Sequence, residues 1–180
     1  MYVIVQPLDQ IAARYGKALD ALGAKDAKIV LVRALNHEGD KGRTKVKRAL
    51  VKQTGIKYGL INSQVTTKRA QRTADGLKYA IVARGTETNL NLFGARQGKR
   101  GVSAAPWGKR RVFKGTFIVP AYGGRVLHRT SKARGPLAAL YGPNIGREIV
   151  KDQSKSEFDT ILPALIERVG VQIKHLLSTR

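Results

Sequence analysis

The sequence predicts an α+β fold in which N-terminal helices and a C-terminal helix pack on an antiparallel sheet. Apolar residues recur at helical spacing within 7–55, alternate with polar residues mainly within 66–130, and return to helical spacing within 144–178. Because helices and strands occupy separate parts of the chain, this order favours α+β over alternating α/β. The length of 180 residues suits one core-bearing domain, so we expect residues 1–180 to form a single domain.

Three helices are expected in the first third of the chain, with the ranges 7–23, 26–39 and 43–55. Pro7 suits the first turn of a helix, and Asp26 is a suitable N-cap. Gly23 and Gly55 are natural C-terminal stops. The glycines at 39 and 42 are expected to separate the second helix from the third.

Five strands are expected in the middle of the chain, with the ranges 66–73, 77–84, 89–93, 114–119 and 125–129. Asp75-Gly76 and Gly123-Gly124 tolerate positive φ, so each pair is expected to turn an antiparallel hairpin. Nearer the C-terminus, Gly142-Pro143-Asn144 predicts a turn that caps a short helix over 145–152. A longer helix is expected over 156–177.

The connection between the strands at 89–93 and 114–119 is unusually basic. Residues 96–111 contain six cations, no acid and the only Trp of the chain, with glycines at 94, 98, 101 and 108 as flexible joints. Like charges repel one another, and glycine raises the entropy cost of ordering. We therefore expect a long basic loop that buries no core, is mobile in the free protein and becomes ordered on a partner.

The net charge is concentrated in the middle of the chain. The protein carries 34 Lys and Arg against 12 Asp and Glu, a formal charge of +22 at pH 7. Residues 41–147 hold 24 of the basic residues and only Asp75 and Glu87 among the acids, so the two ends together are electrically balanced. Such a charge binds phosphates or docks on acidic protein rings, and composition leaves both open.

The candidate interface residues come from the basic connection and from the third expected helix. They are Arg96, Lys99, Arg100, Trp107, Lys109, Arg110, Arg111, Lys45, Lys47 and Arg48. The helix cations form either a solvated face or a binding face. Trp107 is either an anchor in a protein interface or a packed loop tip, and both alternatives stay open.

Catalytic and metal-binding patterns are missing from the sequence. There is no Cys, the histidines at 37, 128 and 175 lie in three separate segments, and no two acids are placed for acid–base work. The stretch from Gly94 to Arg100 resembles a phosphate loop, but its spacing is one residue short and Arg100 stands where Ser or Thr would bind magnesium. We therefore expect a protein that is not an enzyme, with no cofactor and no metal site.

Nothing in the sequence predicts a membrane segment. No stretch approaches about 18 apolar residues, and MYVIVQPLDQ at the N-terminus has neither a charged leader nor a cleavage site. We expect a soluble protein that works where it is made or leaves the cell on lysis.

Several short motifs occur in order along the chain. They are RALNH over 33–37, KGRTKVKRALVKQTG over 41–55, LNLFGARQ over 90–97, GVSAAPWG over 101–108 and LYGPNI over 140–145. Through these motifs the chain resembles the prophage minor tail protein Z family of long-tailed bacteriophages, over about residues 29–169. The resemblance implies a small tail-completion protein, a virion component that is not an enzyme and that sets helices against an antiparallel sheet.

The resemblance also implies where such a protein acts. It would be a structural protein at the head–tail junction of the virion, present in the host cytoplasm during assembly, and needed for joining the tail to the DNA-filled head. Its partners would be other tail and connector proteins, namely the tail terminator ring and the tail tube, and contact with packaged DNA stays open. Tail symmetry implies a homo-oligomeric ring of about six subunits, or about twelve on the portal side. The alternative is a free nucleic-acid-binding protein that acts on DNA or RNA through residues 41–134.

Overall fold

The fold is α+β, as the sequence predicts, and the computed structural model describes residues 2–5, 8–72, 77–85, 87–132 and 135–178. The helices are α1 (Leu8–Leu22), α2 (Ala24–Thr54), α3 (Tyr58–Gln64), α4 (Ile145–Glu148), α5 (Asp152–Asp159) and α6 (Ile161–Ser178). The strands are β1 (Tyr2–Val5), β2 (Val65–Lys68), β3 (Tyr79–Ala83), β4 (Glu87–Asn89), β5 (Arg96–Gly98), β6 (Gly101–Ala104), β7 (Arg111–Lys114), β8 (Thr116–Val119), β9 (Arg125–Arg129), β10 (Leu137–Ala139) and β11 (Tyr141–Asn144). The short 3-10 helices η1 (Leu90–Phe93), η2 (Pro106–Gly108) and η3 (Pro120–Tyr122) connect strands.

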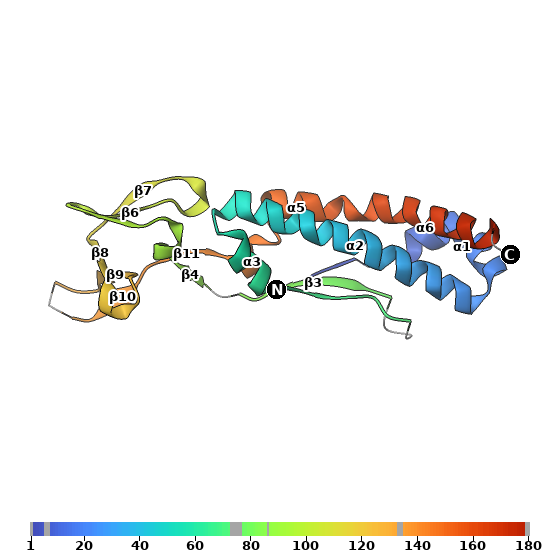
Figure 1. Ribbon diagram of the computed structural model, residues 1–180, viewed down its shortest axis with the longest axis horizontal. Helices are drawn as coiled ribbons and strands as arrows, with labels where there is room; N and C mark the ends of the chain where they lie inside the picture. The colour runs from blue at the N-terminus through green and yellow to red at the C-terminus, as the bar shows by residue number, and fades with distance from the viewer. Residues whose placement is uncertain (1, 6–7, 73–76, 86, 133–134, 179–180) are drawn as a thin grey trace.

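The molecule is elongated, with a helical half and a β half arranged end to end (Figure 1). In the helical half, α2 lies beside α5 and α6, and the sheet β1-β3-β2 runs along α2 (Figure 1). The β half holds the antiparallel sheets β10-β9-β8 and β5-β6-β7 and the pair β11-β4 (Figure 1). The strands thus form four small sheets in the described part of the chain, where a single sheet was expected.

The helix α2 is continuous over 31 residues, so the prediction of two separate helices over 26–39 and 43–55 is wrong. Gly39 and Gly42 lie inside α2, and their missing side chains let other elements approach closely. A Cβ on Gly39 would come within 2.6 Å of the Tyr79 ring, and a Cβ on Gly42 would overlap Ile161. The helix ends at Gly55, whose φ of 74° is the left-handed conformation expected for a C-terminal stop.

The C-terminal helices differ from the prediction in their boundaries. Asn144 caps α4 as expected, because its Oδ1 accepts a hydrogen bond from the Arg147 N–H at 3.1 Å. However, residues 142–144 belong to strand β11 and not to a turn, and α4 stops at Glu148. The helix expected over 156–177 begins earlier and breaks at Thr160, which gives α5 and α6.

The hairpin predictions are partly tested. Gly123 and Gly124 lead into β9 with φ values of 67° and 70°, and β8 pairs antiparallel with β9 as predicted. β2 and β3 also pair antiparallel, although their expected turn at Asp75-Gly76 lies outside the described residues. The strand expected over 89–93 is wrong for most of its length, because β4 ends at Asn89 and η1 follows.

The basic stretch over 96–111 is folded into a sheet, so the expectation of a loop that buries no core is wrong. β6 pairs with both β5 and β7, and its Val102 and Ala104 are fully buried. Gly101 permits the close approach of the two strands, because a Cβ there would overlap the Phe113 carbonyl. Small apolar residues between the cations therefore pack in the core, although the many charges of this stretch indicated a loop.

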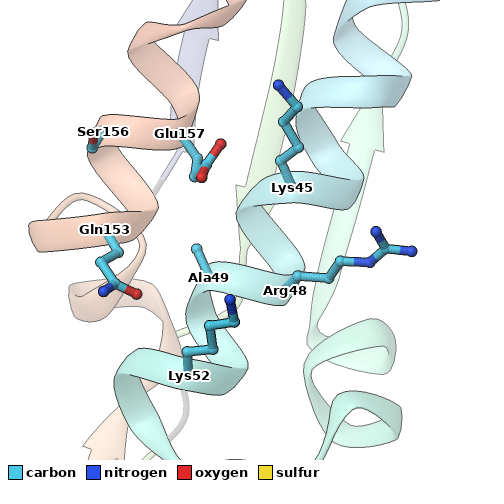
Figure 2. Close-up of a pocket in the computed structure, with 7 residues that line it drawn as sticks. All are labelled: Lys45, Arg48, Ala49, Lys52, Gln153, Ser156 and Glu157. Carbon is cyan, nitrogen blue, oxygen red and sulfur yellow. The ribbon is translucent and has the colours of Figure 1, made fainter.

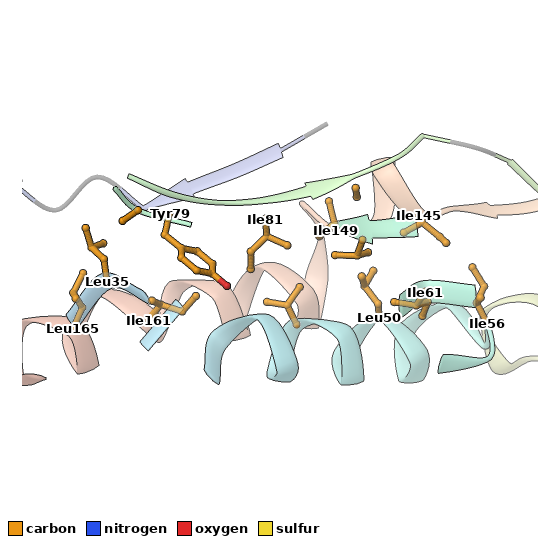
Figure 3. Close-up of a cluster of buried hydrophobic side chains, with 14 of the residues drawn as sticks. Leu35, Leu50, Ile56, Ile61, Tyr79, Ile81, Ile145, Ile149, Ile161 and Leu165 are labelled. Atoms are coloured by element: carbon orange, nitrogen blue, oxygen red, sulfur yellow. The ribbon is translucent and has the colours of Figure 1, made fainter. Parts of the chain in front are cut away.

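One contiguous cluster of buried apolar side chains extends through both halves. Figure 3 shows its part between the sheet β1-β3-β2 and the helices. In the helical half, Tyr79 and Ile81 point from β3 towards the helices (Figure 3). Leu50 and Ile149 continue the cluster towards the β half (Figure 3). Each such side chain contributes about 1.5–3 kcal/mol when fully buried, so the cluster fixes the two halves on each other.

Candidate interaction surfaces

The structure separates the ten candidate interface residues into three groups. The first group lies on the outer face of the β5-β6-β7 sheet, the second at the end of that sheet next to α2, and the third on α2 itself. The first group is Arg96, Lys99, Arg100 and Arg110. The second group is Trp107, Lys109 and Arg111. The third group is Lys45, Lys47 and Arg48.

The outer face of the β5-β6-β7 sheet, called the β-face below, is basic with an apolar centre. Its members follow from the strand register and the alternation of side chains, and they are Arg96, Ser103, Val112 and Lys114. Val112 is 55 % exposed, whereas Val102 on the opposite face is buried. Lys99 and Arg100 form the β5–β6 turn at one edge of the β-face, and both are exposed.

Arg110 ties the β-face to the segment that precedes β5. Its Nη1 donates to Ser103 Oγ at 2.9 Å, and its Nη2 donates to the Gly94 carbonyl at 3.2 Å. Gly94 also borders a hollow of about 330 Å³, where Leu92 supplies apolar surface and Lys57 a cation. Arg110 therefore has a structural role, and the β-face and this hollow are neighbours.

Trp107 is exposed and held in a strained conformation. Its φ of 54° lies in the left-handed region, which costs a residue with a side chain ~1–2 kcal/mol. The residue is 40 % exposed. The Arg111 guanidinium carbon lies 5.8 Å from the centre of the Trp107 ring and 4.8 Å from that of Phe113, within the range of cation–π attraction. Trp107 is thus supported on one side by Arg111 and still presents surface to a partner.

The three candidate cations on α2 differ in their surroundings. Lys45 and Arg48 are exposed, but Lys47 is only 6 % exposed and donates from Nζ to Asn62 Oδ1 at 2.8 Å. Burial, and secondly the charge of Arg43, lowers the pKa of the Lys47 ammonium below its usual value. Lys47 therefore does not reach the surface of this chain, contrary to the expectation that it faces a partner.

Most ion pairs of the described residues lie in the helical half, although the residues outside 88–144 still hold 23 Lys and Arg against 12 Asp and Glu. The pairs of the helical half have N–O distances of 2.6–3.8 Å, and they are Lys41–Glu38, Arg43–Asp40, Arg69–Asp40, Lys151–Glu148 and Lys155–Asp159. Residues 88–144, in contrast, contain 11 Lys and Arg and no acid. The cations of residues 88–144 therefore have no carboxylate within their own stretch, and Glu87, which precedes this stretch in β4, pairs with Arg147 at 3.8 Å.

Two residues of the β-face, Val112 and Lys114, were missed. The signal for them is the alternation in RVFK over 111–114, which places them on the face opposite to Phe113. Lys52 was expected, with the other cations of the helix over 43–55, to belong to a solvated or a binding face, and it follows Arg48 and Lys45 at four and seven residues on one stripe of α2.

The motif segments meet at the seam between the two halves. A Cβ on Gly55, at the end of α2, would approach the Ala105 carbonyl within 3.2 Å. The Ala105 N–H donates to the Phe93 carbonyl at 3.0 Å, and a Cβ on Gly142 would approach the Phe93 ring within 2.8 Å. Residues of four motifs thus form one structural joint.

Two kinds of site are not found in the described part of the chain. No three His, Cys, Asp or Glu side chains gather there as a metal site requires, and no helix there has the length and hydropathy needed to cross a membrane. No protein-family model matches the chain, and neither a curated protein nor a solved structure is detectably similar to it. The resemblance to the minor tail protein Z family therefore stays a prediction based on the motifs.

Proposed function

We propose that the protein is a structural virion component that completes a phage tail at the head–tail junction and enables the tail to join the head. One observation carries the proposal: the β half combines cations that no acid of residues 88–144 can neutralise with exposed apolar side chains, Trp107 and Val112. Such a surface suits an acidic protein ring, because complementary charge steers the encounter and apolar anchors supply affinity. The motifs suggest which ring, namely the tail terminator or a connector protein.

The elongated shape supports the same role. A molecule with helices at one end and small basic sheets at the other can contact two different neighbours, as a protein at a junction does (Figure 1). We propose that copies assemble as a homo-oligomeric ring in the virion after folding in the host cytoplasm. No catalytic step belongs to this role.

The test compares an anchor variant with a steering variant in a joining assay with filled heads and separate tails. Truncation of a large aromatic at an interface centre costs ~2 kcal/mol or more, so Trp107→Ala should reduce joining at every salt concentration. Ala at this position keeps the left-handed strain, so the variant isolates the loss of the ring. Trp107→Phe is the control that retains an aromatic ring, and it should join better than Trp107→Ala.

The steering variant replaces Lys99, Arg100 and Lys109 by Gln together. All five cations of this region are exposed, but Arg110 and Arg111 also contact Ser103 and Trp107 and are therefore left unchanged. Exposed charges act over the ~8–10 Å screening length of physiological salt, so the triple variant should join slowly at low salt and nearly normally at high salt. Normal joining by Trp107→Ala, together with failure of the triple variant at every salt concentration, would contradict the docking role and favour nucleic-acid binding.

A further inference from the structure

A groove lies between α2 and α5, away from the β-face. It has a volume of about 380 Å³, and its lining residues are Lys45, Arg48, Ala49, Lys52, Gln153, Ser156 and Glu157. Figure 2 shows Lys45 and Lys52 on either side of Ala49, Arg48 extending from α2 away from α5, and Glu157 pointing from α5 towards α2. The small side chain of Ala49 leaves the space that larger residues would fill.

The three cations of the groove, called the α2 stripe below, form no ion pair with any described residue. Lys45, Arg48 and Lys52 follow one another at three and four residues, which is a rise of about 4.5 and 6 Å along the helix. Like charges at these spacings destabilise a helix. The nearby Lys151 and Lys155 both pair with carboxylates, whereas the three cations of the α2 stripe pair with no described carboxylate.

The opposite wall of the groove is fixed in position. Gln53, the neighbour of Lys52, donates from Nε2 to Glu148 Oε2 at 2.9 Å and accepts at Oε1 from Ser154 Oγ at 2.8 Å. Ser154 is fully buried. These bonds hold the first turn of α5 against α2, so Gln153 and Ser156 keep a set distance from the α2 stripe.

The lining points to phosphate groups and not to a protein segment. Ala49 is the only apolar side chain among the seven lining residues and is 6 % exposed, so the groove offers no apolar anchor of the kind that protein interfaces use. Lys, Arg, Ser and Gln are the side chains that contact nucleic-acid backbones. We propose that the α2 stripe and its groove bind the phosphates of a double-stranded DNA backbone without reading base sequence. This site is separate from the β-face and does not rest on the docking role.

The test measures the affinity of the full chain for a 24-base-pair DNA duplex as a function of salt. Each phosphate contact contributes about 0.9 to the slope of log affinity against log salt. Replacing Lys45, Arg48 and Lys52 by Gln should therefore reduce the slope by about 2.7. The matched control replaces the exposed Lys17, Lys25 and Lys28 by Gln, which removes the same charge at the other end of α2 and on α1. An equal loss of slope in the control would overturn the proposal, because total charge would then explain the binding.

A second pair of variants tests whether the negative charge in the groove weakens duplex binding. Glu157 is the only acid that lines the groove, so Glu157→Gln should raise duplex affinity more than the control Glu167→Gln on α6 does. Equal effects of the two variants would overturn the proposal. The proposal would also be overturned if the triple α2 variant bound the duplex as tightly as the wild type but no longer bound polyglutamate. The groove would then bind an acidic protein segment.

Discussion

At the scale of single residues, two lysines that are close in the sequence have different surroundings in the structure. Lys45 and Lys47 are two positions apart in α2 and therefore lie on different sides of the helix. Lys45 lines the groove, while the Lys47 ammonium is buried and bonded to Asn62 of α3. A buried cation costs stability unless its partners compensate for lost hydration, and a neutral amide oxygen compensates only in part.

Lys47 should make the stability of the protein depend on pH in the alkaline range. Its folded-state pKa is lowered, mainly by burial, so the unfolded chain holds this proton to higher pH than the folded chain does. The free energy of unfolding therefore gains a contribution that rises with pH between the lowered pKa and about 10.5, the ordinary Lys value. Lys47→Met removes this contribution, so its stability relative to the wild type should fall as the pH rises from 7 to 10.

Urea unfolding at pH 7, 8, 9 and 10 measures that difference. Burial also raises the pKa of Tyr79, which lowers stability above about pH 10 as the unfolded chain ionises first, but this effect is common to both proteins. Lys28→Met, at an exposed position of α2, is the control for loss of a lysine. A constant difference between Lys47→Met and the wild type over this range would refute the prediction.

At the scale of elements, glycine was the residue whose role the sequence could not decide. Gly23 and Gly55 end helices as predicted, and both have positive φ. Gly39 and Gly42 were expected to end helices for the same reason, yet they lie within α2 because Tyr79 and Ile161 pack against them. Those partners are 40 and 119 residues away along the chain, so helix spacing and capping signals carried no information about them.

Alanine at Gly42 and at Gly16 should therefore act in opposite directions. A Cβ on Gly42 would overlap Ile161, so Gly42→Ala should destabilise the fold by about 1–3 kcal/mol, as overpacked cores do. Nothing lies within 4 Å of a Cβ on Gly16 in α1, so Gly16→Ala should stabilise by up to about 1 kcal/mol through helix propensity. Denaturant midpoints of the two variants measure the difference, and a stabilised Gly42→Ala would show that α2 and α6 are not packed as described.

The β5-β6-β7 sheet shows the limit of composition as a guide to elements. Cations and glycines over 96–111 indicated a loop, but strands need only a few well-placed apolar residues when neighbouring strands cover their backbone. Val102 and Ala104 provide these residues, and the Gln97 Oε1 accepts from the Ile118 N–H at 2.9 Å to link the sheet to β8. The alternation of apolar and polar residues is visible in the sequence, whereas the strands with which each segment pairs are not.

At the scale of the whole molecule, the concentration of the net charge in residues 41–147 could be predicted, because charge is counted along the chain. The grouping of the candidate residues could not be predicted. It depends on strand register, which placed Arg96 and Arg110 beside Ser103 and turned Arg111 towards Trp107. The sequence therefore predicted where the basic residues lie along the chain. Only the fold distinguishes cations that hold other residues in place from cations that are free to contact a partner.

Electron cryo-microscopy of particles that carry a tagged copy of this chain tests the central proposal most directly. We expect extra density as a ring at the head–tail junction, with the β half against an acidic neighbour. A label spread along the tail or over the head, or found only in the fraction without particles, would contradict it.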